Sequence, residues 1–223
     1  MGVPQRVSSP LVTRLVLGSA SPARLSVLRA AGVDPMVVVS AVDEDAIIAA
    51  MPPGSAPEAV VTELAEAKAR DVAAGLELED CVVVGCDSML LINGELQGKP
   101  QTAKTARARW ETMAGRTGHL LTGHCVLRVV DGRVTTTARG ENSTVVHFAR
   151  PDARDLDAYI GSGEPLQVAG AFTLDGLGGW FIEKIEGDPS SVIGISLPLM
   201  RKLLAGVGVN IAELWLANPQ PVA

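Results

Sequence analysis

The sequence feature that most constrains the fold is an uninterrupted apolar run from Cys81 to Gly85, followed after Cys86 by Asp87 and Ser88. A strand that is apolar at every position must be covered on both faces, which is typical of central strands in α/β sheets. Such sheets bind ligands at the carboxyl ends of their strands. We therefore expect an α/β fold in which this strand ends by delivering Asp87 to a ligand site.

The flanking sequence supplies more strands and helices for one sheet. Arg14 to Gly18 predicts a short first strand, and the following Ser-Ala-Ser-Pro predicts a helix start, because serine caps helices and proline suits the first turn. Asn93-Gly94 and Asp131-Gly132 each separate β-rich runs and predict antiparallel hairpins. The expected fold is therefore a mixed, twisted sheet with flanking helices, which we place near residues 57–74, 102–114, 152–160 and 191–205.

The sequence contains no internal repeat, low-complexity tract or flexible linker that would divide it. With 47% hydrophobic residues among 223, it has enough apolar surface for one sizeable core or for two lobes that share a sheet. We expect a loose tail at residues 1–12, a single domain at residues 13–215 and a C-terminal tail at residues 216–223.

Composition argues against several classes of protein. The formal net charge is -6 and there are only three Trp, three Phe and one Tyr, so a basic, aromatic surface for a nucleic acid polymer is not expected. No run approaches the roughly 20 apolar residues that span a bilayer, and the N-terminus lacks the layout of a secretory signal. We expect a cytoplasmic protein without a membrane partner. Cys81, Cys86 and Cys125 lack metal-site spacing and are expected to be buried thiols.

The first candidate site is the helix start from Ser19 to Arg24. Exposed amides and the helix dipole favour a phosphate there, while serine hydroxyls add donors and arginine adds a forked cation. The alternative is an ordinary serine cap beside a solvated arginine. The segment alone leaves both interpretations open.

The second candidate is Asp87 with its neighbour Ser88. A carboxylate beside a buried strand needs a cation, a metal or several hydrogen-bond donors. It could hold a hard divalent ion or accept a proton from an attacking water. The alternative is that Asp87 caps the next turn.

Three further charged residues could serve the same site. Lys68 on a predicted helix and Lys99 in a Gly-Lys-Pro loop could neutralise a triphosphate, and Glu44 in an acidic loop could be a second metal ligand. Each could equally be a solvated surface charge. His119 and His124 have no triad or ligand partner by spacing, so we expect them to be structural.

The order of these segments along nearly the whole chain resembles the Maf family of nucleotide pyrophosphatases. The motifs that carry the resemblance are Ser19-Ala20-Ser21-Pro22-Ala23-Arg24, Asp43-Glu44, Ala65-Glu66-Ala67-Lys68-Ala69, Gly85-Cys86-Asp87-Ser88 and Gly94-Glu95-Leu96-Gln97-Gly98-Lys99-Pro100. The second half follows the family at Ala114 to His119, Tyr159 to Pro165, Ala169 to Phe172 and Ile185 to Leu199.

The resemblance implies a two-lobed fold around a cleft, similar to the inosine-triphosphatase-like architecture, and a homodimer. It implies hydrolysis of nucleoside triphosphates to monophosphates and pyrophosphate, with Mg²⁺ or Mn²⁺ as cofactor and a role in clearing modified nucleotides. By the same resemblance, Asp87 is the proton acceptor and, with Glu44, a metal ligand. The remaining implied site residues are Lys99, which acts in catalysis, and Ser19, Arg24, Lys68 and Ser88, which bind substrate.

Departures from the family pattern affect base preference. The family's threonine after the catalytic aspartate is Ser88 here, one arginine of the first motif is Ala23, and a glutamine used for pyrimidine selection in one branch is Asp175. Asp175 is therefore an expected substrate-binding residue whose base preference stays open. Two rival functions also remain: a nucleotide-binding regulator of cell division and a nucleotidyltransferase.

Overall fold

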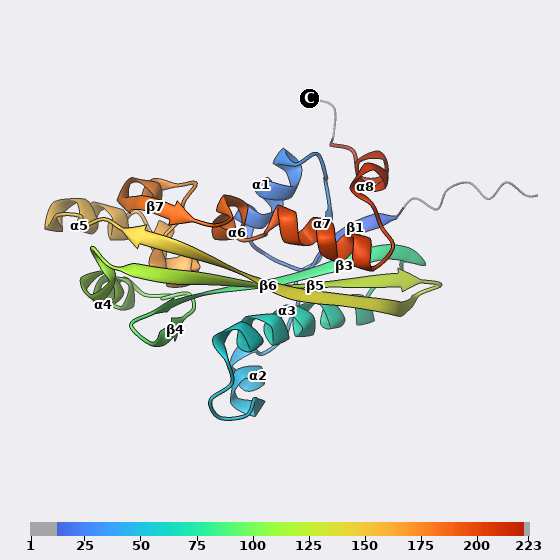
Figure 1. Cartoon of the computed structure of the whole chain (residues 1–223), viewed down its shortest axis with the longest axis horizontal. Helices are drawn as coiled ribbons and strands as arrows, with labels where there is room; N and C mark the ends of the chain where they lie inside the picture. The colour runs from blue at the N-terminus through green and yellow to red at the C-terminus, as the bar shows by residue number, and fades with distance from the viewer. Residues whose placement is uncertain (1–12, 221–223) are drawn as a thin grey trace, which may run out of the picture.

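The computed structural model describes residues 13–220, which form one seven-stranded mixed sheet with helices on both faces (Figure 1). The sheet order is β2-β1-β3-β5-β6-β7, and β4 pairs with β3. Strand β1 runs parallel to β2 and β3, whereas all other pairs are antiparallel. The expected mixed α/β sheet with flanking helices is confirmed. The strands are β1 (Arg14–Leu17), β2 (Met36–Val37), β3 (Asp80–Ile92), β4 (Glu95–Gln97), β5 (Thr117–Val130), β6 (Arg133–Phe148) and β7 (Ile182–Glu186).

Helix α3 covers one face of the sheet, with α2 on the outer side of α3, and α1, α6, α7 and α8 cover the other face (Figure 1). The helices are α1 (Pro22–Ala30), α2 (Glu44–Ala50), α3 (Pro57–Ala74), α4 (Ala103–Met113), α5 (Ala153–Gly161), α6 (Pro189–Ile193), α7 (Leu197–Gly206) and α8 (Ile211–Ala217). Three short 3₁₀ helices, η1 (Glu164–Gln167), η2 (Ala169–Ala171) and η3 (Leu177–Phe181), connect α5 to β7. No helix within residues 13–220 is long and apolar enough to cross a membrane.

Two lobes share the long strands of the sheet. In the first lobe, Val82 and Val84 pack toward α1, α7 and α8, while Val83 packs toward α3, so β3 is buried on both faces as expected. In the second lobe, Trp110 of α4 forms edge-on contacts with Phe148, Tyr159 and Phe181. The long strands therefore carry side chains from one hydrophobic core into the next.

Strand β3 does not end at Gly85, contrary to the expectation from the sequence. It continues to Ile92, because β5 pairs with it from Asp80 through Leu91 and no turn residue interrupts it before Asn93. Asp87 is therefore within the strand. The neighbouring parallel strand β1 does end there, at Leu17 opposite Val84, which leaves an open space beside Asp87.

Both predicted hairpins are confirmed. Asn93-Gly94 joins β3 to β4 and Asp131-Gly132 joins β5 to β6. All four residues have positive φ, between 51° and 80°, as a type I′ turn requires. These turns fix the antiparallel register locally.

The helix expected at residues 191–205 is two helices. α6 ends at Ile193, before Gly194, whose φ of 137° no other residue type adopts readily. α7 begins at Leu197, after its N-cap Ser196. The break turns the carbonyl of Gly194 toward Arg24, where it accepts a hydrogen bond of 2.9 Å from Nε. The interruption thus contributes to the site.

The C-terminal boundary expected at residue 215 falls inside α8. Beyond the helix, Asn218 is fully buried, accepts a 2.8 Å hydrogen bond from the Leu15 amide and donates to the Thr13 carbonyl. Packing against β1 therefore continues at least to Asn218. The tail expected at residues 1–12 lies outside the described residues, as do residues 221–223.

Candidate active site

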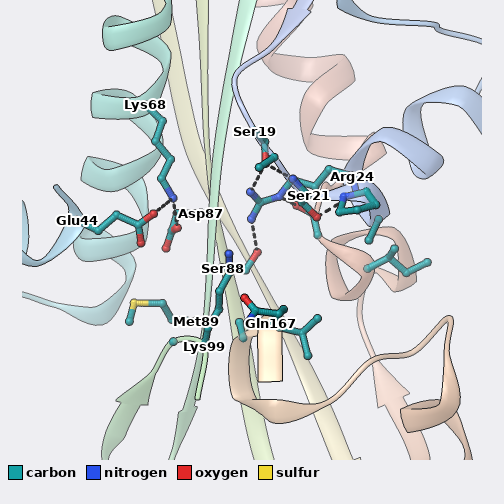
Figure 2. A pocket seen from close by; sticks show the side chains of 18 of the residues that line it. Ser19, Ser21, Arg24, Glu44, Lys68, Asp87, Ser88, Met89, Lys99 and Gln167 are labelled. Carbon is teal, nitrogen blue, oxygen red and sulfur yellow. Dashed lines mark hydrogen bonds and ion pairs between the residues drawn. The ribbon is translucent and has the colours of Figure 1, made fainter. Parts of the chain in front are cut away.

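A cavity of about 660 Å³ lies where the two lobes meet, and all eight site residues expected from the sequence line it. They are Ser19, Arg24, Glu44, Lys68, Asp87, Ser88, Lys99 and Asp175. Figure 2 shows Glu44, Lys68 and Asp87 on one side of Ser88, with Ser19, Ser21 and Arg24 on the other. Segments more than 150 residues apart in the sequence thus contribute to one concave site.

Two glycines bring α3 close to the sheet and thereby place Lys68 beside Asp87. A Cβ at Gly85 would lie 2.1 Å from the Ala65 carbonyl, and one at Gly123 would lie 2.1 Å from the Val61 carbonyl. No side chain larger than hydrogen fits at either position while α3 stays where it is. At this close approach, Lys68 Nζ lies 2.6 Å from Asp87 Oδ1.

Lys68 also pairs with Glu44, whose Oε1 is 2.7 Å from the same ammonium nitrogen (Figure 2). The Lys68 and Asp87 side chains are each about 10% exposed, whereas that of Glu44 is half exposed. Asp43 caps α2 through the amide of Ala46, so Glu44 projects from the first turn of a helix with a defined start. The ammonium group therefore holds two carboxylates together at one wall of the cavity.

Burial raises the pKa of the Asp87 carboxyl above its ordinary value. The positive charges of Lys68 and Arg24 oppose this shift, and the negative charge of Glu44 adds to it. A carboxylate with a raised pKa binds a proton more readily than an ordinary aspartate does. Asp87 therefore combines a negative charge at the cavity wall with the capacity to accept a proton.

Arg24 is fixed on the opposite wall by four hydrogen bonds. Its Nη1 donates to Ser19 Oγ and to the Cys86 carbonyl, both at 2.9 Å, and its Nη2 donates to Ser88 Oγ at 3.2 Å. Its Nε donates to the Gly194 carbonyl, as described above. Ser21, rather than Ser19, caps α1 by accepting from the Arg24 amide. The guanidinium is thus oriented by the protein in advance of any ligand.

A buried chain of hydroxyl groups lies behind Ser88. Thr122 Oγ1 donates to the Ser191 carbonyl at 3.2 Å, which leaves its lone pairs for the Ser88 hydroxyl 3.0 Å away. Ser88 in turn accepts from Arg24. Thr122 is fully buried, so it does not contact a ligand directly, but it sets the rotation of the Ser88 hydroxyl.

Lys99 and Asp175 are exposed on the other rim of the cavity. Arg109 Nη1 donates to the carbonyl of Gly98 at 2.6 Å, which holds the loop that carries Lys99. Among the described residues, no carboxylate lies within ion-pairing distance of Lys99. Lys99 is therefore available to an anionic ligand.

Glu44 and Asp87 are the pair of described residues best placed to hold a divalent cation. Their carboxylates converge on one ammonium nitrogen, and hard divalent ions prefer oxygen donors. Within residues 13–220 there is no group of three or more His, Cys, Asp or Glu side chains with metal-site geometry. The pair fits a cation that takes its remaining oxygen ligands from substrate and water, as is usual for Mg²⁺.

The remaining sequence expectations concern cysteines and histidines. Cys81, Cys86 and Cys125 are free and buried, as expected. His124 is fully buried: its Nε2 accepts from the Ser196 amide, so its Nδ1 donates to the Thr122 carbonyl. That arrangement is structural, as expected, while His119 is exposed on β5.

Several cavity residues were missed from the sequence. They are Met89, Gln167, Val168, Phe172, Thr173 and the Gly194 carbonyl. Gln167 lies between two segments that resemble the family, which was the available signal. Val168 lies in the same interval, and Phe172 and Gly194 fall within the motifs Ala169 to Phe172 and Ile185 to Leu199, although neither was assigned a role. Nothing local marks Met89 or Thr173, because their proximity to the site depends on the contact between the lobes.

Comparison with known proteins gives consistent matches. The family model described as Maf-like protein matches residues 14–207. A nucleoside triphosphate pyrophosphatase of Nocardia farcinica is 65% identical over 207 residues, covering 92% of this chain and 98% of that protein. Proteins of the same name from Rhodococcus erythropolis and Mycobacterium marinum are 65% and 57% identical, covering 92% and 94% of this chain and 97% and 100% of those proteins.

Among solved structures, a nucleoside-triphosphatase (dITP/XTP pyrophosphatase) from Mycobacterium abscessus aligns with a TM-score of 0.35 and 15% identity, covering 63% of this chain and 76% of that one. This similarity is too weak for a comparison of the two sites. The family model, in contrast, spans every residue that lines the cavity, and the relatives each align over most of the chain. The chain belongs to the Maf family.

Proposed function

We propose that this Maf-family protein is a nucleoside triphosphate pyrophosphatase, a hydrolase that converts nucleoside triphosphates to monophosphates and pyrophosphate. The names of its close relatives support the activity. The observation that carries the proposal is a buried carboxylate, Asp87, that faces a cavity between the cations of Lys68 and Arg24. Binding a triphosphate needs such cations, and hydrolysis needs such a proton acceptor.

The triphosphate is held by groups on three elements. Arg24 and Ser19 at the start of α1 bind phosphate oxygens together with the amides of the helix N-terminus. Lys99 on the opposite rim neutralises the pyrophosphate as it leaves, and Ser88 keeps the guanidinium of Arg24 turned toward the phosphates by accepting a hydrogen bond from Nη2. Arg24 is held in place before substrate arrives, so little side-chain entropy is lost on binding.

Asp87 accepts the proton of the attacking water. Burial raises the pKa of its carboxyl, so it is a stronger base than an exposed aspartate, while Lys68 keeps the carboxylate oriented through a 2.6 Å contact. Glu44 shares the same ammonium and orients water or metal at the outer edge. No covalent nucleophile is required.

We further propose that Mg²⁺ or Mn²⁺ binds to the oxygens of Asp87 and Glu44. When bound, the ion neutralises phosphate oxygens and polarises the phosphorus toward attack. A chelator should therefore abolish turnover, and either metal should restore it. Turnover that survives exhaustive chelation would contradict the metal assignment but not the roles of Arg24 and Lys99.

The reaction class is tested with a panel of common and modified nucleoside triphosphates, in which pyrophosphate and orthophosphate are detected separately. We expect pyrophosphate and a monophosphate in equal amounts. Release of orthophosphate with a diphosphate product would contradict the proposal. Because Asp175 replaces a glutamine that selects pyrimidines in one branch of the family, the panel must include purines and pyrimidines.

Arg24 has a matched control on its own helix. Arg24→Ala should lower kcat/KM by at least about tenfold, equivalent to about 1.4 kcal/mol of transition-state stabilisation, because it removes a positioned cation from the site. Arg29→Ala removes an exposed arginine that pairs with Asp34, and it should leave the kinetics unchanged. Equal kinetics in the two variants would show that Arg24 does not contact the substrate.

We also propose that the protein forms a homodimer. The support is the resemblance to the family and the edge strand β2, where Met36 and Val37 are each 41% exposed. Apolar edge strands favour pairing with another chain. Light scattering after gel filtration should give twice the mass of one chain, and Val37→Lys should reduce it. A monomer at all concentrations would contradict the proposal.

A further inference from the structure

Glu164, which is not among the residues expected at the site, holds the loop of residues 173–178. Its Oε1 accepts hydrogen bonds from Thr173 Oγ1 at 2.5 Å and from the Gly178 amide at 2.9 Å. Its Oε2 accepts from the Leu177 amide at 2.9 Å. One half-buried carboxylate therefore ties the first residue of the loop to the last two.

Two glycines let the loop close around this carboxylate. A Cβ at Gly176 would lie 2.6 Å from Glu164 Oε2, and one at Gly178 would lie 2.5 Å from Tyr159 Oη and 2.6 Å from the Thr173 amide. A side chain at either position would clash with these atoms, so only glycine fits in this conformation. The loop conformation and the carboxylate are fitted to one another.

This loop lines the part of the cavity across from Lys68, on the rim that also carries Lys99. Thr173 and Asp175 line the cavity together with Gln167, Val168 and Phe172, a set that is apolar, neutral or acidic. A triphosphate would be repelled by Asp175, whereas the donors and the flat face of a nucleobase match these side chains. In Figure 2, Gln167 lies across the pocket from Lys68 and Glu44. The loop therefore faces the nucleoside when the phosphates lie between Arg24 and Lys68.

The charge on Glu164 matters for this contact. Burial by itself would raise the pKa of the carboxyl, but hydrogen bonds from Thr173, Leu177 and Gly178 outweigh burial and hold the pKa below its ordinary value. The ionised carboxylate offers two acceptor oxygens to three donors. An amide offers one oxygen and places an NH₂ group against a donor, so Glu164→Gln should release part of the loop.

We propose that Glu164 is a positioning residue for base selection, which holds the 173–178 loop so that Thr173 and Asp175 face the nucleoside. This inference rests on the proposed function, because it assigns one end of the same cavity to the base. Glu164 acts through the loop and does not touch the reacting phosphate. Its loss should therefore affect nucleoside recognition more than the chemical step.

The test compares Glu164→Gln with Glu183→Gln, a control that removes the charge of an exposed glutamate on β7 for which no hydrogen bond or ion pair is found among the described residues. Steady-state kinetics are measured on triphosphates of each base. For Glu164→Gln we expect KM for the preferred base to rise about tenfold while kcat changes less than about threefold, and discrimination among bases to fall. Hydrogen exchange should quicken at residues 176–178. Glu183→Gln should match the wild type in its kinetic constants, in its discrimination among bases and in the hydrogen exchange of residues 176–178.

Unchanged base discrimination in a folded Glu164→Gln variant, or a loss confined to kcat, would overturn the inference. So would unchanged hydrogen exchange in the loop. Failure of the proposed function is recognised separately, because the wild type would then release pyrophosphate from no triphosphate. In that case the binding of nucleoside monophosphates to both proteins is measured by calorimetry. Weaker binding by Glu164→Gln than by the wild type supports the inference. Equal binding by the two proteins, or no binding by the wild type, overturns it.

Discussion

At the scale of single residues, the site depends on one buried charge pair and its surroundings. Asp87 and Lys68 are both nearly buried, and an ion pair of this kind contributes little net stability because both charges lose their hydration. Removing one partner is costly, since the other charge stays buried alone. The pair is therefore better explained by the chemistry that a buried carboxylate allows than by stability.

Asp87→Asn tests this explanation directly. The substitution keeps the size of the side chain and removes its charge and its ability to accept a proton, so turnover should fall by about a hundredfold or more. Nucleotide binding should survive, because Arg24 and Lys99 are untouched. Asp45→Asn changes an exposed aspartate on the rim of the same cavity and serves as control. A folded, fully active Asp87→Asn enzyme would exclude Asp87 from catalysis.

His124 gives a prediction about stability and pH. Burial first, and the charge of Arg24 next, lower the pKa of this histidine to about 4 from 6.5. The unfolded chain takes up a proton below pH 6.5 and the folded chain only near pH 4, so the stability contributed by neutral His124 is lost as pH falls through that window. The loss amounts to about 3 kcal/mol.

Urea denaturation of His124→Gln and wild type at a series of pH values measures this contribution. The variant cannot titrate at this position, so its free energy of unfolding should fall less between pH 7 and pH 4 than that of the wild type. His147→Gln, at a histidine on β6 that is less buried and lies beside Glu186, is the control. Parallel pH profiles for His124→Gln and wild type would show that another group causes the loss.

At the scale of elements, the approach of α3 to the sheet determines the distance between Lys68 and Asp87. Gly85→Ala should push the helix outward, because its Cβ would lie 2.1 Å from the Ala65 carbonyl and 2.8 Å from the Ala69 amide. Overpacking of this kind costs about 1–3 kcal/mol. Catalysis should fall as well, since Lys68 moves with its helix.

Gly161→Ala is the matched control for this substitution, because no atom lies within 4 Å of a Cβ at that position. Its thermal stability and kinetics should equal those of the wild type. The informative result is a fall in kcat for Gly85→Ala at temperatures where the variant is fully folded. Wild-type activity in that variant would mean that the spacing between α3 and β3 is not important for the reaction.

Local sequence signals explain which elements could be predicted. Asn93-Gly94 and Asp131-Gly132 specify hairpins within two residues, and the apolar run at 81–85 specifies a buried strand, so these expectations were correct. The end of β3 and the break at Gly194 depend on partners distant in sequence, namely β5 and Arg24. The charged residues that line the cavity were expected from local patterns and from the motif resemblance, whereas no sequence signal marks Met89 or Thr173, because their positions beside the cavity depend on the packing of the lobes.

At the scale of the whole molecule, the cavity lies between the two lobes, which are otherwise connected mainly through the long strands. The first lobe contributes Arg24, Lys68 and Asp87, and the second contributes Phe172 and Asp175. A nucleoside triphosphate that occupies the cavity should therefore contact both lobes. Its binding should stabilise the molecule as a unit.

This last prediction can be measured on Asp87→Asn, which should bind substrate without consuming it. At a nucleotide concentration of about 100 times Kd, binding adds about 2.7 kcal/mol to the free energy of unfolding. For a chain of this size, that corresponds to a rise in Tm of roughly 5–10 °C. Hydrogen exchange should slow both around α1 and β3 in the first lobe and around η1–η3 in the second, because the phosphates contact Arg24, Lys68 and Lys99 while the base contacts the 173–178 loop. Inorganic triphosphate, which lacks the nucleoside, should protect the first lobe and the loop that carries Lys99 but not η1–η3. Protection by the nucleotide that is confined to the first lobe would contradict a bridging ligand and would also place the base outside the 173–178 loop.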